Sequence, residues 1–225
     1  MKKILLILGL VCSGLCGYGQ SAYSEHIIDT GIEKGDVLFS LLLGGTHPAH
    51  HATMQVQGNG INDTVDWGST GGMYGLSTLY FLNDYVGYGM EVNGMDTTYA
   101  VQRVDNVQIK TAMDVWSAML SGRLNMNPHQ SVRLYVPVGA GLSLVRNRWR
   151  LPDTNQSAEE TYLSLGYFIG AGIETNLNSK DHSIGLEVRY TRFGFDKDQF
   201  LDGLRLSGRQ GYGYLAVLLK LNYRF

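Results

Sequence analysis

Apolar and polar residues alternate over the final stretch of the chain, residues 215–225. Every second residue there is apolar: Leu215, Val217, Leu219, Leu221, Tyr223 and Phe225. The positions between them include Lys220, Asn222 and Arg224. A period of two indicates a β-strand whose two faces meet different surroundings. The length fits the roughly 9–11 residues with which a tilted strand crosses a bilayer, so we predict a membrane-spanning strand.

Strand-like alternation recurs in eight segments, which short and long connections join in turn. The segments lie near 36–46, 70–82, 85–95, 109–126, 131–146, 161–176, 183–195 and 210–225. Short connections at 83–84, 127–130 and 177–182 alternate with long ones at about 47–69, 96–108, 147–160 and 196–209. Short turns on one rim and long loops on the other are typical of transmembrane barrels. We therefore predict an all-β fold, an up-and-down antiparallel transmembrane β-barrel of eight strands, with both chain ends on the short-turn rim.

The residues on the second face of each segment indicate which face is inside. In 161–175 one face is apolar, with Leu163, Leu165, Tyr167, Ile169, Ala171 and Ile173. The other face is small and rich in glycine, with Ser164, Gly166, Phe168, Gly170, Gly172 and Glu174. A narrow barrel interior holds such residues, whereas a water-facing surface would be dense in Lys and Glu. We predict that the apolar face meets lipid. A soluble lipocalin-type barrel, which has the opposite phase, is the alternative.

Aromatic residues gather at both ends of the predicted strands. Near the short turns lie Tyr80, Tyr85, Tyr88 and Tyr223, and near the long loops lie Tyr162, Tyr190, Phe195, Tyr212 and Tyr214. Two such clusters match the aromatic girdles at the two membrane interfaces. An open sheet edge in hydrocarbon would leave backbone groups unpaired, so we expect the first and last strands to pair.

The N-terminus has the pattern of an export signal. Lys2 and Lys3 precede the apolar run 4–16, and Gly19 stands before a cut at Gln20. We therefore divide the chain into a signal peptide at 1–19, a short periplasmic segment at 20–35 and an outer-membrane barrel at 36–225.

Both cysteines, Cys12 and Cys16, lie in the predicted signal. Val11 and Leu15 precede them, where lipidation needs a small residue, so we do not expect a lipid anchor. Without Lys2 and Lys3, 16 Lys and Arg remain against 20 Asp and Glu, a net charge of −4. This balance argues against nucleic acid as a partner.

Together, the signal ending at Gly19-Gln20, the stretch Lys34–Leu38, the segment Gly75–Gly89 and the closing alternation to Phe225 resemble a known family. It is that of small eight-stranded outer-membrane β-barrel domain proteins of the Bacteroidetes type, porin-like and related in outline to the OmpA-type barrel. The resemblance implies a bacterial outer-membrane location and no single activity. It also implies that the barrel-assembly machinery reads Leu221, Tyr223 and Phe225. Because no domain follows the last strand, we do not expect the cell-wall tether of long OmpA forms.

Seven charged residues project inward by strand parity. They are Glu91, Arg123, Arg133, Glu174, Glu187, Arg189 and Lys220. An isolated buried charge costs far more than a pair, so these groups must pair in a narrow lumen. We expect a packed polar plug with little or no conduction. The alternative is a narrow channel that opens when the ion pairs exchange partners.

Four arginines near the outer strand ends are candidates for a contact with lipopolysaccharide. They are Arg146, Arg148, Arg150 and Arg192, and parity points Arg146 and Arg192 toward lipid. The planar guanidinium fork suits phosphate. The alternative is an ordinary polar loop base.

Metal and cofactor sites are not expected. His47, His50 and His51 cluster in the first long connection, but no carboxylate or cysteine completes a site. Asp196, Asp198 and Asp202-Gly203 weakly resemble a calcium loop, although Phe200 occupies a ligand position and no Glu closes the cage.

Catalysis on such a barrel requires a serine, a histidine and a carboxylate together on the outer rim. His129 and His182 lie on short turns at the opposite rim, and His26 precedes the barrel. The remaining histidines, those of the first long connection, belong to no catalytic motif.

We therefore expect a non-enzymatic, monomeric outer-membrane barrel with a structural or surface-interaction role. Its expected partners are outer-membrane lipid, lipopolysaccharide and the barrel-assembly machinery, without nucleic acid or a cofactor. A lipid A-modifying hydrolase, a narrow gated channel and a periplasmic lipocalin-like carrier are the alternatives.

Overall fold

A computed structural model describes residues 31–50, 52–58, 61–67, 69–104, 107–152, 155–177, 181–201 and 204–225. The predicted signal peptide with its cut at Gly19-Gln20, His26, His51 and Asp202-Gly203 lie outside the described residues. Over the described ranges, no helix is both long enough and apolar enough to span a membrane.

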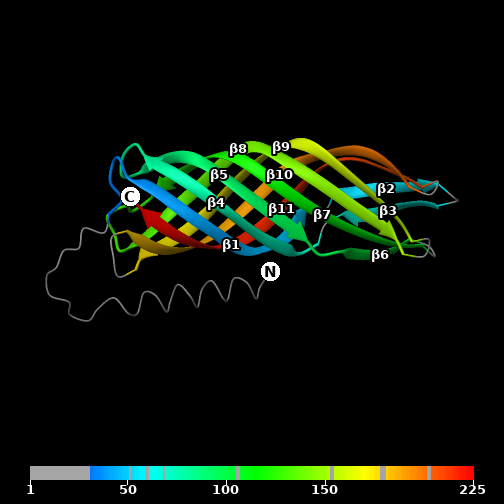
Figure 1. Ribbon diagram of the computed structural model, residues 1–225, viewed down its shortest axis with the longest axis horizontal. Coiled ribbons are helices and arrows are strands. Elements are labelled where there is room, and N and C mark those ends of the chain that lie inside the picture. Colours follow the sequence, from blue (N-terminus) through cyan, green and yellow to red (C-terminus); the bar gives the residue numbers. More distant parts are fainter. Residues whose placement is uncertain are drawn as a thin grey trace.

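Eight strands of the described chain form one closed antiparallel barrel (Figure 1). They are β1 (Val37–His50), β4 (Gly71–Phe81), β5 (Val86–Thr97), β7 (Val107–Asn125), β8 (Val132–Leu151), β9 (Gln156–Asn176), β10 (His182–Leu201) and β11 (Leu204–Arg224). Three shorter strands add to it at one end: β2 (Ala52–Gly58), β3 (Ile61–Trp67) and β6 (Ala100–Val104). The predicted fold class, with its strand number and order, is confirmed.

The barrel closes between its first and last strands. β1 pairs with β11 from Leu38↔Arg224 outward, through Leu43↔Leu219, while β11 pairs with β10 on its other side. The amide of Phe225 donates a hydrogen bond of 2.9 Å to the carbonyl oxygen of Val37. The edges of the sheet are therefore paired where hydrocarbon would surround them, as the cost of unpaired backbone groups in lipid requires.

Alternation along each strand separates an apolar outer surface from the lumen. Leu165 is 77% exposed and Leu219 43% exposed on the outside, whereas Lys220 is 3% exposed inside. The predicted phase, with apolar side chains toward lipid, is confirmed. The predicted aromatic cluster near the short turns also lies on the outer surface of the barrel, because Tyr80, Tyr88 and Tyr223 are exposed.

The outer aromatic cluster was predicted wrongly in part. Tyr212 and Tyr214 lie inside the barrel and are each 1% exposed, so they do not belong to a girdle. Their strand parity is that of Lys220, which already points inward. Their position near the outer end of β11 says nothing about which face they occupy.

The expected long loops are mostly strand. β8 and β9 continue to Leu151↔Gln156, and β10 and β11 to Leu201↔Leu204. The segment 47–69 contains β2 and β3, and 96–108 contains β6. The alternation of apolar residues ends where the strands leave the lipid, but the backbone pairing continues into water. Because the prediction followed the alternation, it assigned these strand ends to loops. At 20 or 21 residues, β8 to β11 are about twice as long as a bilayer requires.

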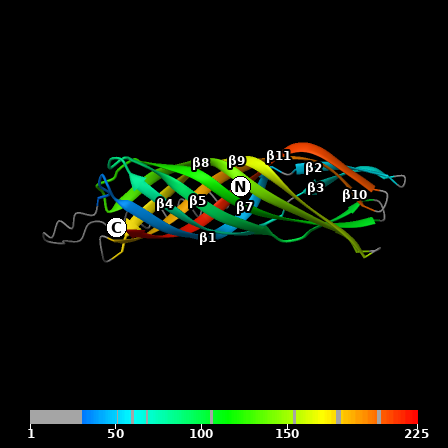
Figure 2. The same ribbon diagram turned by 45° about the horizontal axis from the view of Figure 1, so that its top comes forward.

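Beyond the closed barrel, the strands divide into two arms (Figure 2). β9 and β10 pair from Ser183↔Asn176 only as far as Phe193↔Gly166. We call β6 with the outer ends of β7, β8 and β9 the first arm. The second arm consists of the outer ends of β10 and β11 with β2 and β3, joined through Leu206↔Val56. The hydroxyl of Ser164 donates to the carbonyl oxygen of Gly194 at 2.9 Å, at the point where the arms part.

The lumen is filled in layers. Its outer part is a hydrophobic cluster that includes Met73, Met95, Met113, Trp149 and Tyr212. The predicted polar residues occupy another layer of the lumen, whereas apolar side chains fill this one. On the outer parts of β7 and β8, apolar residues point inward and charged residues point outward, which reverses the phase found at the level of the lipid.

Candidate functional site

Arg189 on β10 joins two carboxylates inside the lumen. Its Nη2 donates to Oε2 of Glu91 on β5 at 3.2 Å, and its Nε donates to Oε1 of Glu187 at 2.6 Å. Lys220 Nζ lies 3.2 Å from Oε2 of Glu187. The guanidinium of Arg189 also stacks on Phe168, 4.2 Å from the ring centroid. All of these charged groups are nearly inaccessible, and each has a partner of opposite charge.

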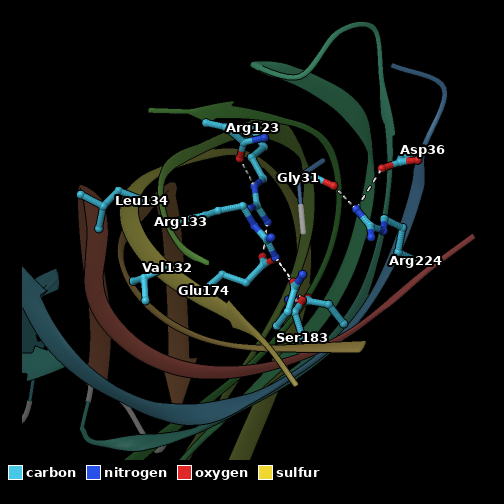
Figure 3. Close-up of polar contacts among 12 residues, drawn as sticks. Gly31, Asp36, Arg123, Val132, Arg133, Leu134, Glu174, Ser183 and Arg224 are labelled. Atoms are coloured by element: carbon cyan, nitrogen blue, oxygen red, sulfur yellow. Dashed lines mark hydrogen bonds and ion pairs between the residues drawn. The ribbon is translucent and has the colours of Figure 1, made fainter. Parts of the chain in front are cut away.

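A second group is centred on Glu174. Arg123 Nη1 lies 2.5 Å from Oε2 of Glu174, and Arg133 Nη2 lies 2.6 Å from Oε1. Figure 3 shows both arginines converging on Glu174, while Val132 and Leu134 point the opposite way. Ser183 adds a hydrogen bond of 3.0 Å to Oε1.

Tyr135 connects the two groups. Its hydroxyl donates to Oε2 of Glu187 at 3.1 Å, and the guanidinium of Arg123 lies 3.9 Å from its ring centroid. The structure thus brings all seven predicted inward charges into one continuous network. Tyr135 was not among the residues predicted for the polar network, although its parity with Arg133 on the same strand predicts that it points inward.

An apolar layer and the N-terminal segment close the short-turn end of the lumen. Ile32, Leu38, Leu79 and Phe81 form a buried cluster there. Arg224 donates to the carbonyl oxygen of Gly31 and lies 3.4 Å from Asp36 (Figure 3). Ile32 is 1% exposed, so the described end of the segment 20–35 seals this mouth of the barrel.

Outward arginines are paired at the outer end of β8. Arg146 binds Glu159 with two hydrogen bonds, from Nε at 2.6 Å and from Nη2 at 2.8 Å. Arg148 Nη2 donates to Asp114 at 2.7 Å. Arg150 Nη2 donates to the side-chain oxygen of Asn155 at 2.6 Å. All three arginines therefore have partners within the protein.

The Arg146–Glu159 pair shifts the protonation of both groups. The hydrogen bond from Arg146 is the main cause that lowers the pKa of the Glu159 carboxyl below that of an ordinary glutamate. The same hydrogen bond raises the pKa of Arg146. Because both side chains are exposed, solvent and salt screen this interaction.

A groove lies beside these pairs on the outside of the first arm. We call it the outer arginine groove, and its volume is about 350 Å³. The side chains that line it include those of Tyr99, Arg148, Arg150, Asn155, Ser157 and Glu159. The guanidinium of Arg148 lies 5.8 Å from the centroid of the Tyr99 ring.

Arg192 does not join this group. It is exposed on β10 and lies opposite Tyr167 of β9, whereas Arg146 lies opposite Thr161 of the same strand. Six residues along a strand are about 20 Å apart. The four arginines therefore form one cluster of three and one separate side chain.

The described residues contain no group of three or more His, Cys, Asp or Glu side chains that could hold a metal ion. His47 lies on β1, opposite Leu215. Asp196 and Asp198 lie within β10 rather than in a loop. His129 lies at the short-turn rim, with Nε2 3.5 Å from Oδ2 of Asp84, and His182 begins β10 at the same rim.

Solved structures of several outer-membrane proteins are similar to this chain. OprG from Pseudomonas aeruginosa superposes with a TM-score of 0.55 at 12% identity, covering 87% of this chain and 98% of that chain. Ail of Yersinia pestis gives a TM-score of 0.43 at 16% identity, with coverages of 85% and 99%. The outer membrane protease OmpT from Escherichia coli gives 0.46 at 8% identity, with coverages of 84% and 96%. At such low identity, the similarity to OprG shows the fold alone. No curated protein matches the chain.

Residues 40–225 match the family model described as outer membrane protein beta-barrel domain. The match covers nearly all of the closed barrel and both arms. It confirms the predicted family resemblance and the bacterial outer-membrane location, while the narrower Bacteroidetes-type assignment stays a prediction. The chain belongs to the outer membrane protein beta-barrel domain family.

Proposed function

We propose that this protein is a closed, non-catalytic barrel that holds an ordered β-sheet surface outside the membrane for contact with other molecules. The observation that supports this most strongly is the filling of the lumen. From one end to the other, a hydrophobic cluster, an ion-paired network and a second apolar cluster follow one another. An eight-stranded interior is just wide enough to be filled by side chains.

The ionic layer leaves little room for solvent. A cavity of about 10 Å³ lies beside Glu91, Arg123 and Arg189 in this layer. That volume corresponds to a single water molecule. Ions would have to break several buried pairs to pass, and each broken pair leaves an uncompensated charge.

The two arms supply the surface for contacts. They are built from paired strands, so the backbone of the projecting surface has a defined register, in contrast to that of a flexible loop. The arms lie on the side opposite the short turns, which face the periplasm in outer-membrane barrels. The surface they form is therefore directed outside the cell.

The exposed C-terminal alternation supports recognition by the barrel-assembly machinery. Leu221, Tyr223 and Phe225 are all exposed on the outer surface, with Phe225 at 73%. The rings of Tyr223 and Phe225 are 4.6 Å apart and nearly perpendicular. This apolar edge is accessible before the strand enters lipid.

Two measurements on purified, folded protein test the proposed function. In planar bilayers, we expect no single-channel current steps above the baseline of empty bilayers. After incubation with lipid A, we expect mass spectrometry to find the lipid unchanged. Current steps would show a channel, and a lost acyl group or an added group would show an enzyme. Either result contradicts the proposal.

A further inference from the structure

The outer arginine groove begins two rows of side chains beyond the last apolar row on the outside of β8. Trp116, Leu144 and Leu163 are outward neighbours in one row across β7, β8 and β9, and each is exposed. The next rows outward along β8 carry Arg146, then Arg148, then Arg150. Successive rows are about 7 Å apart along a strand, and barrel strands tilt by about 35–45°. The groove is therefore at the height where lipid headgroups and their sugars lie.

Among the residues that the structure describes, Arg150 has no carboxylate partner at the groove. Arg146 is matched by Glu159, and Arg148 by Asp114. Arg150 is exposed, and its hydrogen-bond partner is the neutral amide of Asn155. These five charged side chains carry a net charge of +1, which favours an anion. A guanidinium is suited to phosphate and carboxylate because its donors form a planar fork.

The remaining lining suits a polar ring. Tyr99 is 50% exposed beside Arg148, and Ser157 and Asn155 supply a hydroxyl and an amide. An exposed aromatic ring next to such groups can pack on the face of a sugar while the polar groups bond its hydroxyls. The volume of about 350 Å³ lies within the range of small-molecule sites.

We propose that the outer arginine groove binds an anionic saccharide, a sugar that carries phosphate or carboxylate. Arg150 and Arg148 contact the anionic group, and Tyr99 packs against the sugar ring. The saccharide comes either from the headgroup of a glycolipid in the outer leaflet or from solution. This inference rests on the proposed function, since it names the chemistry of one contact that the projecting surface makes.

The experiment uses the full folded protein and two matched pairs of probes. Lipid A with its phosphates is compared with dephosphorylated lipid A in nanodiscs, by native mass spectrometry of the complex. Glucose 6-phosphate is compared with glucose in detergent solution, by calorimetry. We expect the phosphorylated member of at least one pair to bind about tenfold more tightly. The pair that shows this preference identifies the source of the saccharide.

Two variants with matched controls test the site itself. We expect Arg150→Gln to weaken binding of the preferred probe about tenfold, and Arg192→Gln, the same change at a distant exposed arginine, to leave it within about twofold. Tyr99→Ala should weaken binding, whereas Tyr85→Ala, at a similarly exposed ring on the opposite rim, should not. Heat-modifiable migration on gels checks that every variant is folded.

The outcomes separate this inference from the proposed function. Equal losses of affinity in Arg150→Gln and Arg192→Gln would mean that the probe is attracted by charge over the whole surface, and this would contradict a binding site in the groove. If neither phosphorylated probe binds and the barrel does not conduct, the saccharide site is contradicted while the proposed function stands. A barrel that conducts current, and whose binding of the probe still depends on Arg150, would contradict the proposed function but support the saccharide site.

Discussion

Glu91 and Arg189 form an ion pair across the full width of the barrel. Their strands, β5 and β10, are four places apart in either direction around the closed path of eight barrel strands described above. The pair therefore connects opposite walls, and Arg189 also binds Glu187 on its own strand. No neighbouring-strand contact could fix the separation of the walls in this way.

The first prediction concerns this crossing. Arg189→Met removes the guanidinium that pairs with Glu91 and should lower the free energy of unfolding by about 3–5 kcal/mol, because a buried charge loses its counter-ion. Urea unfolding of protein folded in liposomes measures the change. Arg192→Met, an exposed arginine on the same strand, is the control and should have little effect. Equal stabilities of the two variants would contradict a structural role for the ion pair between Glu91 and Arg189.

The second prediction tests the two faces of the last strand. Leu219→Arg places a charge in lipid and should cost about 2–4 kcal/mol near the membrane mid-plane. Lys220→Arg keeps a cation beside Glu187 in the lumen and should cost much less. Refolding into liposomes over a urea series measures both. Comparable losses at the two positions would show that the phase is reversed.

The third prediction concerns packing against Tyr135. A methyl group on Gly172 would overlap the Tyr135 ring, whereas a methyl group on Gly72 would have no atom within 4 Å. Gly172→Ala should therefore cost about 1–3 kcal/mol through overpacking, and Gly72→Ala should be nearly neutral. Unfolding midpoints in urea compare the two variants. A neutral Gly172→Ala would mean that Tyr135 does not hold the position that links the two halves of the network.

The fourth prediction concerns pH. The pKa of Glu159 is lowered in the folded protein, chiefly by its hydrogen bond from Arg146. The stabilisation from this pair is present above the pKa of an unfolded glutamate and is lost as the pH falls through the lower, folded value. Arg146→Gln should raise the pKa of Glu159 toward the ordinary value. Carbon NMR of the labelled Glu159 carboxyl measures the titration, and an unchanged midpoint in the variant would contradict the pairing.

Strand parity predicted which face each residue occupies but could not predict its partners. It placed Arg133 and Glu174 inside, and the structure shows them opposite each other on adjacent strands. The contact of Arg189 with Glu91 depends on the stagger of strands on opposite walls, which no local pattern encodes. The pairing of Arg146 with Glu159 was hidden because Glu159 falls in the stretch 147–160, which lacks apolar alternation and was predicted as a connection.

The outer halves of the strands were misread for a related reason. Trp149 points inward beyond the lipid-facing surface, while Arg148 on the same strand points outward. In water the apolar side chains belong inside, and in lipid they belong outside. A sequence rule that assumes one phase for the whole strand therefore fails where the surroundings change.

This reversal constrains how the strands can align during folding. Sliding β8 by one residue would turn Arg133 into the acyl chains at one end and expose Trp149 to solvent at the other. A single misalignment thus incurs two penalties, in media of opposite polarity. A shift that favoured one end of β8 would destabilise the other end. The correct register is therefore favoured along the whole length of the strand.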